Sequence, residues 1–266
     1  MIIGKRIFLM KSYVSYRFKA KTRFRIHSPF VFDLVESVLR DKNRYPGYDM
    51  IDRYKRKLSC SKSEIETIDY GKMGTTGVPA TYTVKLGKLV KLRSQRKQQA
   101  QLLYRLTQKF QPETLLEIGT AAGFSASYLK FPVPGSKMIS LEGCPNLASV
   151  AENTCNALNL QNIEIRTGDF ERSLPEALRE FKTIDFIFFD GNHKKEATLH
   201  YFSQCVEKAT EKSVFVFDDI HWSPGMAEAW DTIKKDLRVT LSIDLFWLGL
   251  VFFRKGSPKQ DFIIRY

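Results

Sequence analysis

The chain has 266 residues, of which 43% are hydrophobic and 27% charged, the composition of a globular protein that can bury a full core. No run approaches the ~18 consecutive apolar residues of a transmembrane helix. Lys5, Arg6 and Lys11 interrupt the apolar N-terminus, so we expect no secretory signal. The four cysteines form no CxxC pair, which argues against a disulfide framework or a zinc site. We therefore expect a cytoplasmic protein, with attachment to the inner face of the membrane as an open alternative.

The positive charge is concentrated at the N-terminal end. Residues 1–112 hold 25 Lys and Arg against 8 Asp and Glu, whereas residues 113–266 hold 17 against 21. The first acidic residue, Asp33, follows eight basic ones that are interleaved with aromatic residues. Such an arm suits a nucleic acid, an anionic membrane surface or an acidic partner. A solvated basic face whose aromatic residues pack on the main domain is the alternative without a partner.

Residues 1–86 predict a basic, mainly helical extension. Helical periodicity is visible within 28–58, and the glycines of 71–87 predict a flexible loop. We expect this extension to act as a lid or as a segment that binds a substrate or partner. Residues 87–266 then form the main domain.

From residue 113 onward, short apolar runs alternate with segments of helical pattern. Five runs predict strands that are buried on both faces: 114–118, 138–141, 163–165, 184–189 and 214–217. Pro145 and the pair Ser223-Pro224 mark helix starts between them. The alternation predicts a doubly wound, mostly parallel α/β sheet. Residues 239–245 and 247–253 are too close for a crossover, so they predict an antiparallel hairpin at the end of a seven-stranded sheet.

The first predicted strand runs into the sequence EIGTAAGFS (117–125). Its small residues let the backbone turn tightly and approach a ligand: Gly119, Ala121, Gly123 and Ser125. A dinucleotide-binding turn would have glycine at 119, 121 and 124. Ala121 and Phe124 do not fit that pattern, so the turn predicts a different ligand.

S-adenosylmethionine (SAM) fits this turn better, because it carries a sulfonium, an ammonium and no phosphate. Glu117 can offset its positive charge, and Glu142-Gly143 at the next strand end can accept hydrogen bonds from the ribose. Gly168-Asp169-Phe170 ends the third predicted strand, where an acid and an aromatic can meet the adenine. An ion pair at Glu117 and a solvated strand end at Glu142 are the alternatives. Three such features at carboxyl strand ends, where open α/β sheets bind ligands, favour a cofactor pocket.

The sequence resembles class I SAM-dependent methyltransferases. The matching segments are LLEIGTAAGFS (115–125), ISLEG (139–143), TGDF (167–170), IDFIFFDGNH (184–193) and VFVFDDIHW (214–222). Within the class the sequence looks most like catechol O-methyltransferase-type and related small-molecule O-methyltransferases. From HSPFVF (27–32) onward it also resembles uncharacterised bacterial methyltransferase-like proteins, which indicate no substrate. The resemblance implies a Rossmann-like methyltransferase fold, with 87–266 as the SAM-binding domain.

Three acids follow neighbouring predicted strands. Asp190 ends the fourth strand, and Asp218 and Asp219 end the fifth. Like-charge repulsion between them would raise their pKa values, and a divalent cation such as Mg²⁺ would relieve it. The resemblance implies the same, since metal-dependent O-methyltransferases have acidic ligands at positions matching these three, although the third is often an amide. Asp190 is also expected to contact the cofactor.

The position of the family's lysine base is occupied here by His193, and Lys194 follows it. A histidine can serve as the base because its ordinary pKa lies near neutrality. We expect His221, with Trp222, to line the acceptor pocket and His221 to take part in catalysis. A turn cap at Asp218 and a core position for His221 are the alternatives.

We expect methyl transfer from SAM to an oxygen of a small or lipid-like acceptor, driven by alignment of the nucleophile with the sulfonium methyl group. Two alternatives stay open. One is RNA methylation with the basic segment as docking surface, and the other is a non-catalytic binding protein on a relict methyltransferase fold. The sequence DGNH (190–193) lacks the Asn/Asp-Pro-Pro-aromatic motif, which argues against methylation of base amines.

Overall fold

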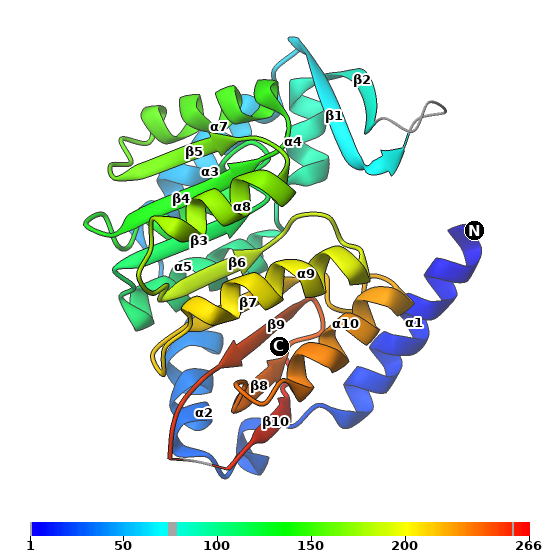
Figure 1. The fold of residues 1–266 in the computed structure, drawn as a ribbon, viewed down its shortest axis with the longest axis vertical. Coiled ribbons are helices and arrows are strands. Elements are labelled where there is room, and N and C mark those ends of the chain that lie inside the picture. Colours follow the sequence, from blue (N-terminus) through cyan, green and yellow to red (C-terminus); the bar gives the residue numbers. More distant parts are fainter. Residues whose placement is uncertain (1, 74–78, 257) are drawn as a thin grey trace. The chain divides into compact units, whose positions relative to one another are not determined.

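The computed structural model describes residues 2–73, 79–256 and 258–266. The chain divides into two compact units, drawn in Figure 1. Unit 1 consists of Met1–Asp41 and Lys182–Tyr266, and unit 2 consists of Lys42–Phe181. Residues of the expected N-terminal extension therefore belong to both units.

Unit 2 contains three parallel strands with helices between them. Its elements are α3 (Pro46–Ser59), β1 (Glu64–Met73), β2 (Pro79–Lys85), α4 (Leu86–Arg93), α5 (Lys97–Phe110), β3 (Thr114–Ile118), α6 (Phe124–Lys130), β4 (Lys137–Glu142), α7 (Pro145–Ala157), β5 (Ile163–Thr167) and α8 (Phe170–Arg179). Strand β4 pairs in parallel with β3 on one side and with β5 on the other. This confirms the predicted strand–helix alternation.

The prediction of a flexible loop over 71–87 is wrong for the described part of that range. Strands β1 and β2 form an antiparallel hairpin, with Ile65 opposite Val84 and Thr67 opposite Tyr82. The β-branched and aromatic residues of this segment favour strands, and the glycines concealed that signal. Residues 74–78 lie outside the described part of the chain.

Unit 1 combines the N-terminal helices with the C-terminal strands. Its elements are α1 (Ile2–Lys19), a 3-10 turn (Arg23–Arg25), α2 (Pro29–Leu34), a π turn (Val35–Leu39), β6 (Phe186–Phe189), α9 (Lys195–Cys205), a second 3-10 turn (Val206–Lys208), β7 (Val214–Asp218), α10 (Pro224–Lys235), β8 (Leu241–Asp244), β9 (Leu248–Phe252) and β10 (Gln260–Ile263). The strand order is β6-β7-β9-β8-β10.

The predicted hairpin at the C-terminal end is confirmed. Strand β9 runs antiparallel to both β7 and β8, while β6 and β7 are parallel. The predicted count of seven is one short, because β10 adds an eighth strand, parallel to β8. The four residues of β10 are a short and only partly apolar run, so their sequence gave little signal.

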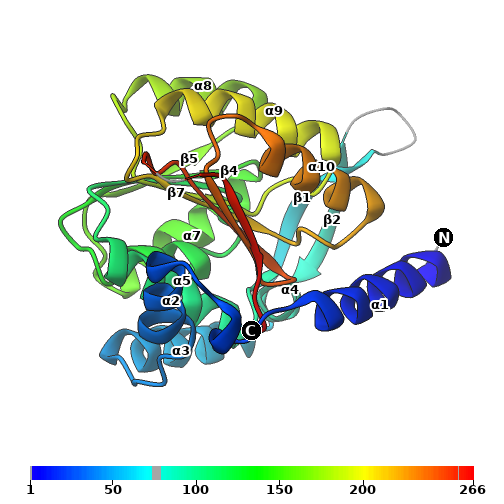
Figure 2. The ribbon, with the colours of Figure 1, turned by 90° about the horizontal axis from the view of Figure 1, so that it is seen from below.

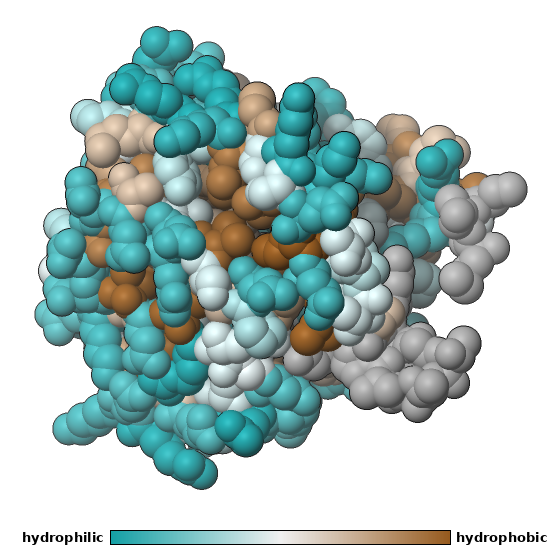
Figure 3. Space-filling model, turned by 90° about the horizontal axis from the view of Figure 1, so that it is seen from above, coloured by the Kyte–Doolittle hydropathy of each residue, from teal (hydrophilic) through white to brown (hydrophobic). Residues whose placement is uncertain are grey.

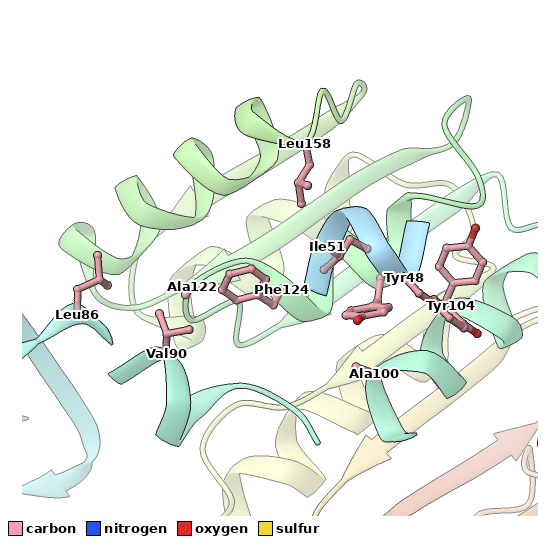
Figure 4. Packing of buried hydrophobic residues seen from close by; sticks show 10 residues of the cluster. Tyr48, Ile51, Leu86, Val90, Ala100, Tyr104, Ala122, Phe124 and Leu158 are labelled. Carbon is pink, nitrogen blue, oxygen red and sulfur yellow. The ribbon is translucent and has the colours of Figure 1, made fainter. Parts of the chain in front are cut away.

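The core of unit 2 explains one departure from a dinucleotide-binding turn. Ala122 and Phe124 are buried in a cluster with Ile51 of α3 and Val90 of α4, as Figure 4 shows. Burying a phenylalanine side chain stabilises a fold by about 2–3 kcal/mol. Phe124 therefore anchors the start of α6 to the surrounding helices.

Hydrophilic residues cover most of the face drawn in Figure 3, and hydrophobic patches lie between them. Among the described residues, no helix combines the length and the apolar character needed to cross a bilayer.

The start of α10 follows the signals predicted from the sequence. Ser223 caps α10 by accepting a hydrogen bond from the backbone N–H of Met226 at 3.2 Å, with Pro224 next in the chain.

Candidate active site

The turn after β3 contains positive φ angles, which residues other than glycine adopt only with strain. Gly119 has φ +101°, Gly123 has φ +82°, and Ala121 takes a left-handed φ of +48°. The backbone N–H groups of Gly119 and Thr120 both donate to the carbonyl of Leu141, at 3.0 and 3.1 Å. The turn is thereby fixed to the end of β4. Its exposed backbone edge is at Gly119 and Ala121, which are partly accessible.

Gly123 is required by packing as well as by its φ angle. A Cβ atom at this position would lie 3.0 Å from Cα of Ala151 in α7, closer than side chains normally approach a backbone. The glycine thus lets the start of α6 pack closely against α7. The predicted role of Gly123 as a cofactor-contacting residue stays a prediction.

Glu117 lies at the end of β3 and is completely buried. Ser140 of β4 donates a hydrogen bond from its hydroxyl to Oε2 of Glu117. Burial raises the pKa of Glu117 to about 7, although the hydroxyls of Ser125 and Ser140 favour the ionised form. A carboxylate with this pKa is readily ionised when a cation comes near it.

Glu142 at the end of β4 holds the turn in place. Its Oε2 accepts a hydrogen bond from the N–H of Ala121 at 2.8 Å, and its Oε1 accepts one from the N–H of Cys144 at 2.9 Å. Burial raises the pKa of this carboxyl, and these backbone donors and the charge of Arg93 oppose the shift. The backbone N–H of Gly143 also donates to this carboxylate, and its remaining lone-pair capacity is available for a further hydrogen bond.

The acid that follows β5 caps the next helix. The side chain of Asp169 caps α8 by accepting a hydrogen bond from the N–H of Glu171 at 3.2 Å. Asp169 is exposed, and Gly168 and Phe170 beside it are partly exposed. Gly143, by contrast, is buried. The expected contacts of these residues with a cofactor stay predictions.

In unit 1, an acidic strand end and a histidine lie together. One ligand atom from each of Asp190, His193 and Asp218 falls within 4.8 Å of the others. Nε2 of His193 is 3.6 Å from Oδ1 of Asp190. Asp219, expected as the third metal ligand, is not in this group, and its backbone is left-handed with φ +54°.

His193 is poised to be neutral near pH 7. Burial lowers the pKa of its imidazole; the charge of Asp219 opposes this shift, and the charge of Lys5 adds to it. A neutral imidazole has a free lone pair that can accept a proton or coordinate a metal ion. Both roles are thus chemically open to His193.

Comparisons with known proteins show what this chain is similar to. The sequence profile of a methyltransferase-domain family matches residues 116–220, from β3 through β7. A catechol O-methyltransferase of Niastella koreensis is 30% identical over 125 residues, which are 46% of this chain and 56% of that protein. The catechol O-methyltransferase of Bos taurus is 26% identical over 103 residues, which are 37% of each chain. The chain thus matches about half or less of the length of these curated relatives.

Solved structures show the same fold at lower identity. A Bacillus cereus O-methyltransferase in complex with SAH superimposes with a TM-score of 0.55 at 19% identity, covering 84% of this chain and 97% of that one. An SAH-bound methyltransferase of Podospora anserina gives a TM-score of 0.59 at 11% identity, with coverages of 86% and 98%. Residues 116–220 of this chain are thus similar to a methyltransferase domain. The fold of the chain is the predicted Rossmann-like one.

The structure places His221 next to an acid that sequence analysis missed. Nε2 of His221 lies 2.8 Å from Oδ2 of Asp244, the last residue of β8, and its ring stacks on Phe246 at 5.2 Å. Asp244 also accepts a hydrogen bond from the N–H of Phe246 at 2.8 Å. His221 is therefore held in one orientation. The pairing with Asp244, 23 positions away, left no local signal in the sequence.

The contact of Lys5 with Trp222 was also not predicted from the sequence. Its Nζ lies 3.4 Å from the ring centroid of Trp222, a cation–π contact. Burial lowers the pKa of this amine, and the charge of Asp219 opposes the shift. Only the basic composition of the first residues hinted at such a contact.

The hairpin of unit 2 is a third feature that the sequence analysis did not anticipate. Its Glu66 carbonyl accepts a hydrogen bond from Nδ2 of Asn146 at 2.8 Å, and Ile65 and Val84 pack against the buried cluster that contains Cys144. The hairpin therefore lies against the segment that follows Glu142, which is the expected ribose contact.

Proposed function

We propose that this protein transfers the methyl group of SAM to an oxygen of a small or lipid-like acceptor. The observation that carries the proposal is the turn after β3, where Glu142 fixes the backbone at Ala121 within the segment that matches the methyltransferase profile. The SAH-bound neighbours support the choice of cofactor. We further propose that residues 87–266 form the catalytic domain and 1–86 an extension that serves it.

The residues of the turn fit a sulfonium nucleoside. Gly119 and Ala121 present backbone without bulky side chains, and Glu142 retains lone pairs for the ribose hydroxyls. Glu117 supplies a carboxylate whose raised pKa would fall when a cationic ligand is bound nearby. Its role would be to stabilise the positively charged cofactor electrostatically.

The acidic group of unit 1 fits a divalent cation. Asp190, Asp218 and His193 would be its ligands, in place of the expected set with Asp219. When bound, the metal would lower the pKa of an acceptor hydroxyl and orient it. An imidazole in the set widens the choice beyond Mg²⁺ toward Mn²⁺ or Zn²⁺, because Mg²⁺ prefers oxygen ligands.

His193 provides the proton acceptor when it is not a metal ligand. Its neutral imidazole takes the proton of the acceptor hydroxyl, the oxygen attacks the methyl carbon, and the bonding pair returns to sulfur. The products are a methyl ether or ester, SAH and the imidazolium ion. His221, held by Asp244, would orient the acceptor rather than carry the proton.

Isothermal titration of the purified chain with SAM and with SAH tests the cofactor. Labelled methyl transfer into fractionated lipid, RNA and small-molecule extracts, with and without EDTA, then tests the acceptor and the metal. Absence of SAM and SAH binding would overturn the proposal. Labelled methyl groups found in RNA alone would show that the acceptor is RNA. Binding of SAM without methyl transfer into any fraction would indicate a non-catalytic protein on a relict methyltransferase fold.

A further inference from the structure

Helix α1 has two apolar sides, and only one of them is covered within unit 1. Tyr16 is buried; its hydroxyl donates to the carbonyl of Ile264 at 2.6 Å, and its ring lies 5.3 Å from that of Phe246. Lys5, three turns earlier on the same side, contacts Trp222. This side holds α1 against the segments that follow β7, β8 and β10 of its unit.

The opposite side of α1 carries an exposed apolar stripe. Ile7 is 44% exposed, Met10 63%, Val14 48% and Phe18 87%. The spacings of three and four residues bring these side chains onto one face of the helix. Figure 2 shows α1 extending away from the strands of unit 1. Four large apolar side chains in one row are more than the isolated exposed residues of an ordinary surface.

The charges around the stripe indicate what covers it. By helical geometry Arg6 and Arg17 flank it on one side and Lys11 on the other, and all three are exposed. Residues 1–32 contain eight Lys and Arg and no acidic residue. A second copy of this chain would bring an equally basic arm against the first, and the two would repel each other.

We propose that α1 lies on the surface of an anionic lipid bilayer, with the stripe of Ile7, Met10, Val14 and Phe18 inserted at the boundary of headgroups and acyl chains. Helices with an apolar face flanked by Lys and Arg bind membranes in this way. The 18 residues of α1 span about 27 Å, and its basic residues keep it on the surface instead of across the bilayer. The inference does not depend on methyl transfer.

Co-sedimentation of the full chain with vesicles tests the proposal. The protein should partition onto vesicles of phosphatidylcholine with phosphatidylglycerol at least about tenfold more strongly than onto phosphatidylcholine alone, and salt should weaken the binding. The double variant Met10→Ser/Phe18→Ser should lose about tenfold in partitioning. Leu237→Ser is the matched control, since Leu237 is 96% exposed in the same unit but lies outside α1, and it should bind as the unchanged protein does.

Equal binding by the stripe variant and the unchanged protein would overturn the proposal. Equal binding to neutral and anionic vesicles would overturn it too, and this comparison needs no variant. Sedimentation velocity without lipid provides a further check. A dimer that the stripe variant dissociates would assign the stripe to a second copy, and a monomer is the expected result. An RNA mobility shift in the absence of any vesicle binding would assign the basic arm to nucleic acid and contradict the proposal.

Discussion

Replacing Glu117 by glutamine is expected to stabilise the protein above pH 7 and to weaken its binding of SAM. The carboxyl group is completely buried, and burial raises its pKa from 4.5 to about 7. Glutamine has nearly the same shape and can still accept the hydrogen bond from Ser140. The variant therefore removes the charge and leaves the packing in place.

The direction of the stability change follows from proton binding by Glu117 in the folded and unfolded states. Between pH 4.5 and about 7 the folded protein keeps a proton on Glu117 that the unfolded chain has lost, so the free energy of unfolding falls as the pH rises. The difference between 4.5 and about 7 corresponds to about 3 kcal/mol. Glu117→Gln should gain up to this amount at pH 8 and almost nothing at pH 4.5.

Urea unfolding at several pH values, followed by tryptophan fluorescence, measures the effect. Glu171→Gln, at an exposed position on α8, is the control and should change stability by less than about 0.5 kcal/mol at every pH. A Glu117→Gln protein that is less stable at pH 8, or whose gain does not vary with pH, would refute the reasoning. Calorimetry should show at least about tenfold weaker SAM binding by the same variant, since the proposed electrostatic stabilisation of the cationic cofactor is lost.

Four further outcomes are expected. Gly123→Ala should lower the free energy of unfolding by about 1–3 kcal/mol, because φ is +82° and Ala151 is close; thermal unfolding measures it. Tyr16→Phe loses the hydrogen bonds to Ile264 and Tyr266 and should lower the free energy of unfolding, measured with urea, by about 1–2 kcal/mol. Glu142→Gln places an amide N–H against at least one of the backbone donors of Ala121, Gly143 and Cys144 and should weaken SAH binding about tenfold in calorimetry. Methyl transfer should decline only at a pH below the ordinary histidine pKa of 6.5, because burial lowers the pKa of His193; a pH–rate profile with its half-maximal rate above pH 6.5 would contradict this.

The local sequence determined the strands, the turn and the helix starts. Runs such as Thr114–Ile118 are apolar because both faces of the strand are covered, and Ser223-Pro224 starts α10 because a capping hydroxyl and proline suit the first turn. Small residues at 119–123 signalled a tight backbone turn for the same local reason. The hairpin β1–β2 was missed although its signal was local, because its glycines outweighed its β-branched residues.

Tertiary structure alone decided which side chains meet. His193 joins Asp190 and Asp218 in one group of possible ligands, and Asp219, with its left-handed backbone, is not part of that group. No spacing in the sequence fixes this difference. His221 pairs with Asp244, and Lys5 reaches Trp222 across more than two hundred residues. Such contacts depend on how separate elements pack, and packing reflects the summed fit of many side chains instead of a periodic pattern.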